Sequence, residues 1–254
     1  MPDTALVTGA SSGIGEQFAR QLAARGNDLI LVARRRDRLE ALAESLPGTA
    51  HVVLCDLATE AGSLPDKVAE LGVEVDLLVN NAGFGTYGHF VELDPKREAE
   101  EVRVNCEAVV TLTHAFLPAM LQRRRGGVIV VASTAGMQPI PYEAVYSASK
   151  AFALRFTEAL SEELRGSGVR MLAVNPGPVP TEWQEIAGHD DTGIVPGEIP
   201  AEQVVHESLE AYDAARRSVI PGRTIRWIIR AGGPSPRGLQ LRITERIFRR
   251  GLKR

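Results

Sequence analysis

The sequence is poor in cysteine and in long apolar runs, and each shortage excludes a class of protein. Cys55 and Cys106 are too few for a disulfide framework or a metal-ligand cluster, so we interpret both as small buried or half-buried residues. No apolar run approaches the roughly 20 residues of a membrane-spanning helix, and no charged segment followed by an apolar one opens the chain. His89, His114 and His206 are dispersed, so we expect no metal site. These absences favour a cytoplasmic protein.

The 254 residues carry a formal net charge of −3 and fit one large α/β domain. Apolar runs rich in β-branched residues alternate with helical patterns, which is typical of βαβ units. We therefore predict a doubly wound, Rossmann-type parallel sheet with helices on both faces and a ligand crevice at the carboxyl ends of the strands. The expected strands are residues 5–7, 28–33, 51–54, 75–79, 127–132, 169–174 and 218–220, and the expected helices include residues 36–46, 96–121 and 144–164.

A glycine-rich stretch, residues 8–15 (TGASSGIG), lies between the first expected strand and an amphipathic helical pattern. Most glycine-rich turns bind nothing, but this context is specific. Glycines at a strand-to-helix turn let the main chain approach a ligand closely, and the N–H groups that open the helix then face a pyrophosphate. We predict a dinucleotide cradle formed by Gly9, Ser11, Ser12, Gly13, Ile14 and Gly15.

The end of the second expected strand indicates which dinucleotide is preferred. In such folds an acidic residue there bonds the ribose 2′-hydroxyl of NAD. This chain has Ala33 at that place, followed by Arg34, Arg35 and Arg36. Guanidinium groups suit a 2′-phosphate, so the preferred cofactor is NADP(H), and NAD(H) is the less favoured choice. The alternative is a solvated basic turn before the next helix.

Tyr146 and Lys150 are four residues apart in an expected helix, which places both side chains on one face. A phenol with a pKa of about 10 is a weak acid–base catalyst at neutral pH, and a neighbouring ammonium stabilises its phenolate. Such a pair alone is more often a surface contact. Two features favour catalysis here: Ser133 ends an apolar strand at the expected crevice, and Asn105 interrupts an otherwise apolar helix face.

Seven motifs, in this order and spacing, resemble the compact single-domain branch of the short-chain dehydrogenase/reductase family; they are residues 8–15, residues 80–83, Asn105, Ser133, Tyr146, Lys150 and the pair Pro176 and Gly177. The resemblance covers about residues 3–185. It implies hydride transfer between a nicotinamide cofactor and a carbonyl compound or alcohol. It also implies a homo-oligomer, a dimer or tetramer, formed through the two long helices, residues 94–121 and 144–164.

The resemblance implies a role for each site residue. Tyr146 would be the general acid in carbonyl reduction and the base in alcohol oxidation, while Ser133 bonds the substrate oxygen. Lys150 would lower the pKa of Tyr146 and hold the nicotinamide ribose, and Asn105 would support a water that relays protons. The other implied cofactor contacts are Asp56 and Leu57 at the adenine ring, Asn81 beside the adenosine ribose, and Val179 and Thr181 at the nicotinamide carboxamide.

The sequence says less about the substrate. In this family a segment after the sixth strand covers the pocket, and residues 178–200 here would form such a mobile lid. Candidates to line the pocket, for each of which ordinary packing is the alternative, are Phe84, Tyr87, His89, Met137, Gln138, Tyr142 and Trp183. Their apolar bias favours a hydrophobic ketone, aldehyde or secondary alcohol.

Residues 223–254 depart from the compact family pattern and form a basic amphipathic extension to a catalytic domain of residues 1–222. Ten Lys/Arg and one Glu give the extension a net charge of +9, so the other 222 residues carry −12. We expect it to pack over the lid or against the acidic body of a neighbouring subunit, and peripheral contact with an anionic membrane is the alternative. Because no aromatic platform or recognition motif accompanies the basic residues, we expect no nucleic-acid partner.

Three functions fit these patterns. The leading one is an NADP(H)-dependent enzyme that interconverts a small-molecule carbonyl compound and an alcohol. The second is a non-catalytic NADP(H)-binding redox sensor, whose hallmark would be a damaged Ser–Tyr–Lys set; here the set is complete. The third is a membrane-associated reductase of lipid metabolism, which shares the chemistry and differs in substrate and location.

Overall fold

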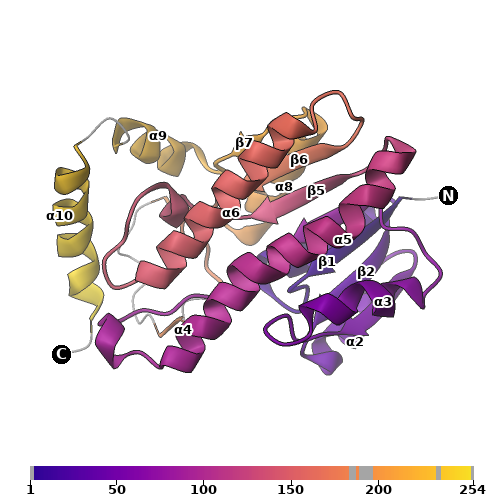
Figure 1. The fold of residues 1–254 in the computed structure, drawn as a ribbon, viewed down its shortest axis with the longest axis horizontal. Helices are drawn as coiled ribbons and strands as arrows, with labels where there is room; N and C mark the ends of the chain where they lie inside the picture. The colour runs from indigo at the N-terminus through magenta and orange to yellow at the C-terminus, as the bar shows by residue number, and fades with distance from the viewer. Residues whose placement is uncertain (1–2, 183–186, 189–196, 233–235, 253–254) are drawn as a thin grey trace.

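A seven-stranded parallel sheet forms the centre of the computed structural model, which describes residues 3–182, 187–188, 197–232 and 236–252 (Figure 1). Its order is β3-β2-β1-β4-β5-β6-β7, so the direction of winding changes between β1 and β4. This confirms the predicted doubly wound fold. The strands are β1 (Thr4–Thr8), β2 (Asp28–Ala33), β3 (Ala50–Leu54), β4 (Leu77–Asn80), β5 (Gly127–Val131), β6 (Arg170–Val174) and β7 (Ser218–Val219).

Helices cover both faces of the sheet. One face packs α1 (Gly13–Ala24), α2 (Arg36–Ser45) and α8 (Ala201–Asp213), and the other packs α3 (Leu64–Ala69), α5 (Ala108–Arg123) and α6 (Ala144–Glu163). Successive strand residues point to opposite faces, so Leu29 shares a core with Phe18 of α1 whereas Ile30 shares the other core with Leu112 of α5. Burial on both faces explains why the strands are almost continuously apolar.

β4 begins two residues later than predicted, at Leu77 rather than Val75. The intervening Asp76 is buried, and its carboxylate accepts hydrogen bonds from the Thr4 N–H at 3.2 Å and from Arg125 Nη2 at 3.0 Å. A buried carboxylate needs such partners. Asp76 is therefore fixed at the amino edge of the sheet, and regular pairing starts after it.

The predicted helix 96–121 runs from Pro95 to Arg123, but it is not α-helical throughout. α4 (Pro95–Val102) and α5 are joined by a π-helical turn, Arg103–Glu107, which contains Asn105. Single π-turns inside α-helices are rare and are found most often at functional sites. By length and composition alone the whole helix could cross a membrane, which the sequence had not led us to expect. Its α5 part packs fully buried side chains, among them Leu112 and Met120, into the core of the sheet.

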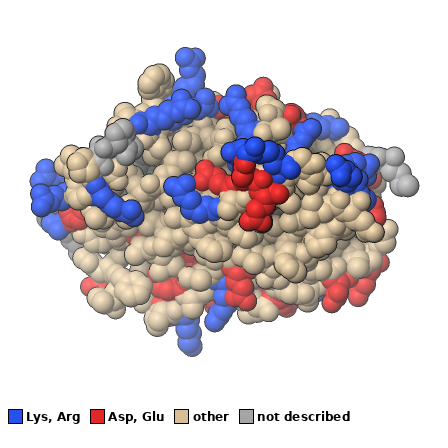
Figure 2. Space-filling model, turned by 45° about the horizontal axis from the view of Figure 1, so that its top comes forward, with Lys and Arg blue, Asp and Glu red and all other residues tan. Residues whose placement is uncertain are grey.

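The C-terminal extension folds as α9 (Arg223–Gly232) and α10 (Arg237–Phe248). α10 stands apart from the sheet at one end of the molecule (Figure 1), and Lys and Arg side chains lie at this end as well as along the rest of the upper part of the molecule (Figure 2). Phe248 packs in a small apolar cluster with Tyr87, Ala135 and Ile140. The extension thus contacts the body of its own chain, next to the segments that follow β4 and β5.

Candidate active site

A cavity of about 1170 Å³ lies along the carboxyl ends of the strands. Its lining includes residues that follow each of β1 to β6, as expected for the ligand crevice of a doubly wound sheet. Of the predicted site residues, Gly15 and Asn105 lie behind the lining. The others line it: Gly9, Ser11, Ser12, Gly13, Ile14, Arg34, Arg35, Asp56, Leu57, Asn81, Ser133, Tyr146, Lys150, Val179 and Thr181.

The glycine-rich loop takes the form that its sequence predicts. Gly9 and Gly13 have φ angles of +66° and +57°, in the left-handed region that favours glycine. A Cβ at Gly15 would lie 2.2 Å from the carbonyl oxygen of Gly9, so the loop packs directly on the first turn of α1. The Ser12 hydroxyl makes no capping bond to that turn. The first N–H groups of α1 therefore suit an anion such as a pyrophosphate.

Thr8 and Asn81 fix this loop against the end of β4. The Asn81 side-chain amide donates to the Thr8 carbonyl oxygen at 2.9 Å. The Thr8 hydroxyl accepts hydrogen bonds from the backbone N–H groups of Asn81 and Ala82, each at 3.0 Å. Asn81 lines the cavity, as a ribose contact requires, and it also positions the loop.

Two arginines after β2 form a cationic corner beside the loop. Arg35 donates to the hydroxyls of Ser11 at 3.0 Å and Ser12 at 2.8 Å. Arg34 is more exposed and lies 3.8 Å from the Asp56 carboxylate. Guanidinium groups next to hydroxyl donors are a suitable setting for a phosphate.

Ser133, Tyr146 and Lys150 come together at the other end of the cavity. The Ser133 hydroxyl is hydrogen-bonded to the Tyr146 side chain and accepts from the backbone N–H of Ala135 at 3.0 Å. Lys150, one helical turn after Tyr146, is buried. Its Nζ donates to the Val131 carbonyl oxygen at 2.8 Å and lies 5.9 Å from the centre of the Tyr146 ring. Two hydroxyl groups thus converge beside a buried ammonium.

Burial shifts the pKa values of this group. It raises the pKa of Tyr146 well above its ordinary value of 10.0, while the hydrogen bond with Ser133 acts in the opposite direction. It lowers the pKa of Lys150 to about 8, while the nearby Glu101 carboxylate raises it. The resemblance had implied a lowered pKa for Tyr146. The direction differs because the loss of water around the phenol outweighs the hydrogen bond with Ser133, and because the Glu143 and Glu101 carboxylates raise the pKa further. Tyr146 is therefore a protonated phenol at neutral pH.

The π-turn places Asn105 behind Lys150. The Asn105 amide is buried, and its Nδ2 donates to the Phe84 carbonyl oxygen at 2.8 Å and to the Ser149 hydroxyl at 2.9 Å. Its Oδ1 accepts from the Phe84 N–H at 3.2 Å. A Cβ on Gly83 would lie 2.9 Å from Asn105 Oδ1 and 3.0 Å from Lys150 Nζ. Only glycine leaves room between these two polar groups.

A family model described as short chain dehydrogenase matches residues 3–191. The chain belongs to this family. One relative, a very-long-chain 3-oxoacyl-CoA reductase of Neurospora crassa, is 36% identical over 177 residues, which are 65% of this chain and 52% of that protein. The chain spans between 52% and 60% of the length of several curated relatives that it matches.

Solved structures resemble the chain over nearly its whole length. A short-chain dehydrogenase from Sphingobium yanoikuyae in complex with NADPH has a TM-score of 0.82 and 32% identity, covering 94% of this chain and 95% of that one. A bulky-bulky ketone specific alcohol dehydrogenase from Comamonas testosteroni has a TM-score of 0.77 and 29% identity, covering 94% of each chain. Because this coverage exceeds that of the family model, the likeness includes most of the C-terminal part.

Two buried glutamates beside this short-chain dehydrogenase site were missed in the sequence. Glu101 is fully buried and accepts a hydrogen bond from the Thr86 hydroxyl at 3.1 Å; burial raises its pKa to about 7. Glu143 lines the cavity just before α6, and burial raises its pKa to about 8, with a further contribution from Glu101. Glu101 could have been found from the sequence by its spacing, because it lies four residues before Asn105 in a predicted helix and so shares a face with it.

α9 and α10 supply a wall of the cavity that sequence reasoning also missed. The Tyr142 hydroxyl donates a hydrogen bond to the Glu245 carboxylate at 2.9 Å, and the Tyr87 hydroxyl donates one to the Phe248 carbonyl oxygen. These two bonds attach the last turn of α10 to the catalytic domain. The cavity-lining residues from the two helices are mainly apolar: Ile225, Ile228, Ile229, Gly232, Arg237, Gln240, Ile243, Thr244, Ile247 and Phe248.

The predicted pocket residues divide into two groups. Phe84, Met137 and Gln138 line the cavity. Tyr87 and Tyr142 lie outside the lining because their hydroxyls hold α10, and His89 packs edge-on against Tyr142 with the ring centres 5.3 Å apart. Trp183 and most of the predicted lid, residues 183–186 and 189–196, lie outside the described residues.

Proposed function

We propose that this chain is an NADP(H)-dependent oxidoreductase that interconverts a fairly hydrophobic carbonyl compound and its alcohol, with Tyr146 as the acid and base. One observation carries the proposal: the hydrogen-bonded Ser133 and Tyr146 hydroxyls lie beside Lys150 in the same cavity as the glycine-rich loop. Such a cavity lets a dinucleotide reach from the phosphate-binding loop to the paired hydroxyls.

The residues present fit a dinucleotide. The pyrophosphate would lie at the first turn of α1, where side chains at Gly9 and Gly15 would collide with neighbouring backbone. Leu57 and Asp56 would contact the adenine ring, and Val179 and Thr181 the nicotinamide end, since all four line the cavity. The bound cofactor supplies or accepts the hydride.

In the chemical step, the protein would stabilise and protonate the carbonyl oxygen of the substrate. Ser133 and Tyr146 would donate hydrogen bonds to the carbonyl oxygen as negative charge develops on it. A protonated Tyr146 then transfers its proton to that oxygen in reduction, and accepts it back in oxidation. Lys150 would hold the nicotinamide ribose, and a water supported by Asn105 would carry the replacement proton from solvent to Lys150 and on to Tyr146.

The preference for NADP(H) rests on the corner formed by Arg34 and Arg35. Both line the cavity at the end of β2, and no carboxylate follows that strand directly to repel a 2′-phosphate. The complex of the Sphingobium yanoikuyae relative with NADPH agrees with this preference.

The hydrophobic substrate follows from the wall that α9 and α10 build. Ile228, Ile243 and Ile247 face the cavity together with Phe248. Apolar side chains bind apolar substrate groups by removing their surface from water. The names of two relatives, one specific for bulky-bulky ketones and one reducing very-long-chain 3-oxoacyl-CoA, point the same way.

The test is a fluorescence titration with NADPH and with NADH, followed by a panel of ketones and aldehydes. Tighter binding of NADPH, with oxidation in the presence of a hydrophobic carbonyl compound, is the expected result. Binding without turnover on any carbonyl compound would favour the redox sensor. Absence of NADPH binding would refute the cofactor site.

Three further expectations remain proposals: a cytoplasmic location, a homo-oligomer, and peripheral membrane contact through residues 223–254. The last has a specific observation in its favour, because Trp227 and Leu239 are exposed among the arginines of α9 and α10, at 72% and 49%. Equal cosedimentation with anionic liposomes by the full chain and by a chain ending at Pro221 would exclude membrane contact.

A further inference from the structure

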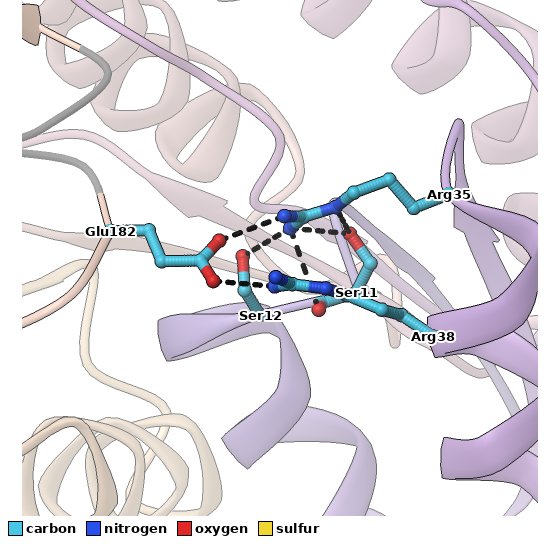
Figure 3. A network of polar contacts seen from close by, with 5 residues as sticks. All are labelled: Ser11, Ser12, Arg35, Arg38 and Glu182. Carbon is cyan, nitrogen blue, oxygen red and sulfur yellow. Dashed lines mark hydrogen bonds and ion pairs between the residues drawn. The ribbon is translucent and has the colours of Figure 1, made fainter.

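The cationic corner at the end of β2 already holds an anion, the carboxylate of Glu182. Glu182 Oε2 lies 2.8 Å from Arg35 Nη1, and its Oε1 lies 2.5 Å from Arg38 Nη1 (Figure 3). Arg35 at the same time donates to the hydroxyls of Ser11 and Ser12. The two guanidinium groups hold the pKa of Glu182 down at about 2. Two guanidinium groups thus hold one carboxylate, and the hydroxyls of Ser11 and Ser12 hold one of these guanidinium groups, that of Arg35.

Glu182 comes from a distant part of the chain. It follows Thr181, a predicted nicotinamide contact, and is 147 residues beyond Arg35. Its carboxylate, like Ser11, Ser12 and Arg35, lines the cavity. The ion pairs of Glu182 therefore join the segment after β6 to the segment after β2 at the cavity.

The same donors would be needed by a 2′-phosphate. A phosphate oxygen and a carboxylate oxygen accept guanidinium hydrogen bonds in the same planar geometry, and a guanidinium group presents a limited set of N–H donors. The Nη1 hydrogen that Arg35 donates to Glu182 is not available to a second anion in the same position. NAD(H), which has no 2′-phosphate, makes no such demand.

We propose that Glu182 competes with the 2′-phosphate of NADP(H) for Arg35, and so sets how strongly the chain prefers NADP(H) over NAD(H). The proposal rests on the proposed function, because it assumes a dinucleotide in this cavity. Arg38 does not line the cavity, and its part is to hold the competing carboxylate through the second oxygen of Glu182. Each bound NADP(H) displaces the carboxylate, whereas NAD(H) binds with the Glu182 bridge intact.

The test compares Glu182→Gln with a matched control, Glu40→Gln. Glu40 also pairs with an arginine of α2, Arg36, at 3.2 Å, but it does not line the cavity. The two variants thus remove the same charge from the same neighbourhood. The affinities to measure, by calorimetry, are those for NADPH, NADH and the fragment adenosine 2′,5′-bisphosphate.

We expect Glu182→Gln to raise the affinity for NADPH and for the bisphosphate about fivefold, because the ion pairs it removes are partly exposed and individually weak. The affinity for NADH should change less than about twofold, and Glu40→Gln should change none of the three. An equal change for NADPH and NADH, or weaker NADPH binding, would overturn the competition and make Glu182 a structural tether.

The outcomes also separate this inference from the proposed function. A wild-type chain that prefers NADPH, with a preference that Glu182→Gln leaves unchanged, overturns only the competition. A wild-type chain without preference whose Glu182→Gln variant prefers NADPH supports the competition. No preference in either chain contradicts both the competition and the proposed cofactor.

Discussion

The two ends of the cavity are built in different ways. At the cofactor end, Arg35 bonds Ser11 and Ser12 of the glycine-rich loop, and the bonded residues are at most 24 positions apart in the sequence. At the substrate end, Tyr87 holds a residue 161 positions away, and Tyr142 holds one 103 positions away. Turn chemistry needs particular residue types and is therefore visible in a sequence. A wall made by packing two remote helices needs only apolar residues, and many placements would satisfy it.

The largest expected effect is on Tyr146, the proposed proton donor. Tyr146→Phe removes the proton that the carbonyl oxygen requires, so kcat should fall about 10³-fold. NADPH affinity should stay within about twofold of wild type, because the ring remains. Steady-state kinetics and a binding titration check both. A kcat close to wild type would refute the role of Tyr146.

A side chain at Gly15 should damage the cofactor end alone. In Gly15→Ala the new Cβ would meet the Gly9 carbonyl oxygen at 2.2 Å, so the loop must move away from α1. We expect NADPH to bind about 100-fold more weakly, a loss typical of strained, overpacked sites. Gly62→Ala is the control, because its Cβ would meet no atom within 4 Å. Equal effects of the two substitutions would count against the loop as the phosphate site.

Glu101 is buried near Lys150 without lining the cavity, and it should affect stability rather than binding. Its pKa is raised from 4.5 to about 7 in the folded chain, so the folded state holds a proton that the unfolded state has released between these pH values. Its stabilising contribution is complete below about pH 4.5 and is lost as the pH rises to about 7, by roughly 1 kcal/mol per pH unit.

Glu101→Gln should remove this loss. The free energy of unfolding can be measured with urea at pH 5 and at pH 8. Its decrease between these pH values should be about 2 kcal/mol smaller in the variant than in the wild-type chain. An identical pH dependence in the two chains would contradict the raised pKa.

Arg34→Ala should separate the two cofactors. Arg34 is exposed, so its loss should lower kcat/KM with NADPH about tenfold and with NADH less than about twofold. Arg36→Ala is the control, since Arg36 pairs with Glu40 and does not line the cavity. Equal losses with both cofactors would point instead to a solvated basic turn.

The smallest effect should come from the substrate end. Ile243 lines the cavity and is 48% exposed, so truncating it should raise KM for a hydrophobic ketone about fivefold without affecting NADPH binding. Leu239 is 49% exposed on the same helix but does not line the cavity, and Leu239→Ala should leave KM unchanged. If the two variants behave alike, α10 is not a wall of the substrate site.

The features that could be predicted from the sequence differ from the others in how local they are. The parallel sheet, the cradle at Gly9 and the Tyr146–Lys150 spacing were predictable because each depends on a short repeat or a fixed spacing. The π-turn was not, since one extra residue barely disturbs a helical pattern. The carboxylate that meets Arg35 was not predictable either, because Glu182 reaches it only after β6 has paired with β5.

The π-turn at residues 103–107 has a consequence for how this chain can change over time. A π-turn holds one residue more than the α-helical turn it replaces, and its backbone hydrogen bonds are poorer. Losing that residue would restore a regular helix, yet it would rotate everything on one side by about 100° and withdraw Asn105 from Phe84 and Ser149. Selection for a more stable helix and selection for the Asn105 hydrogen bonds to Phe84 and Ser149 therefore act in opposite directions on the same residue count.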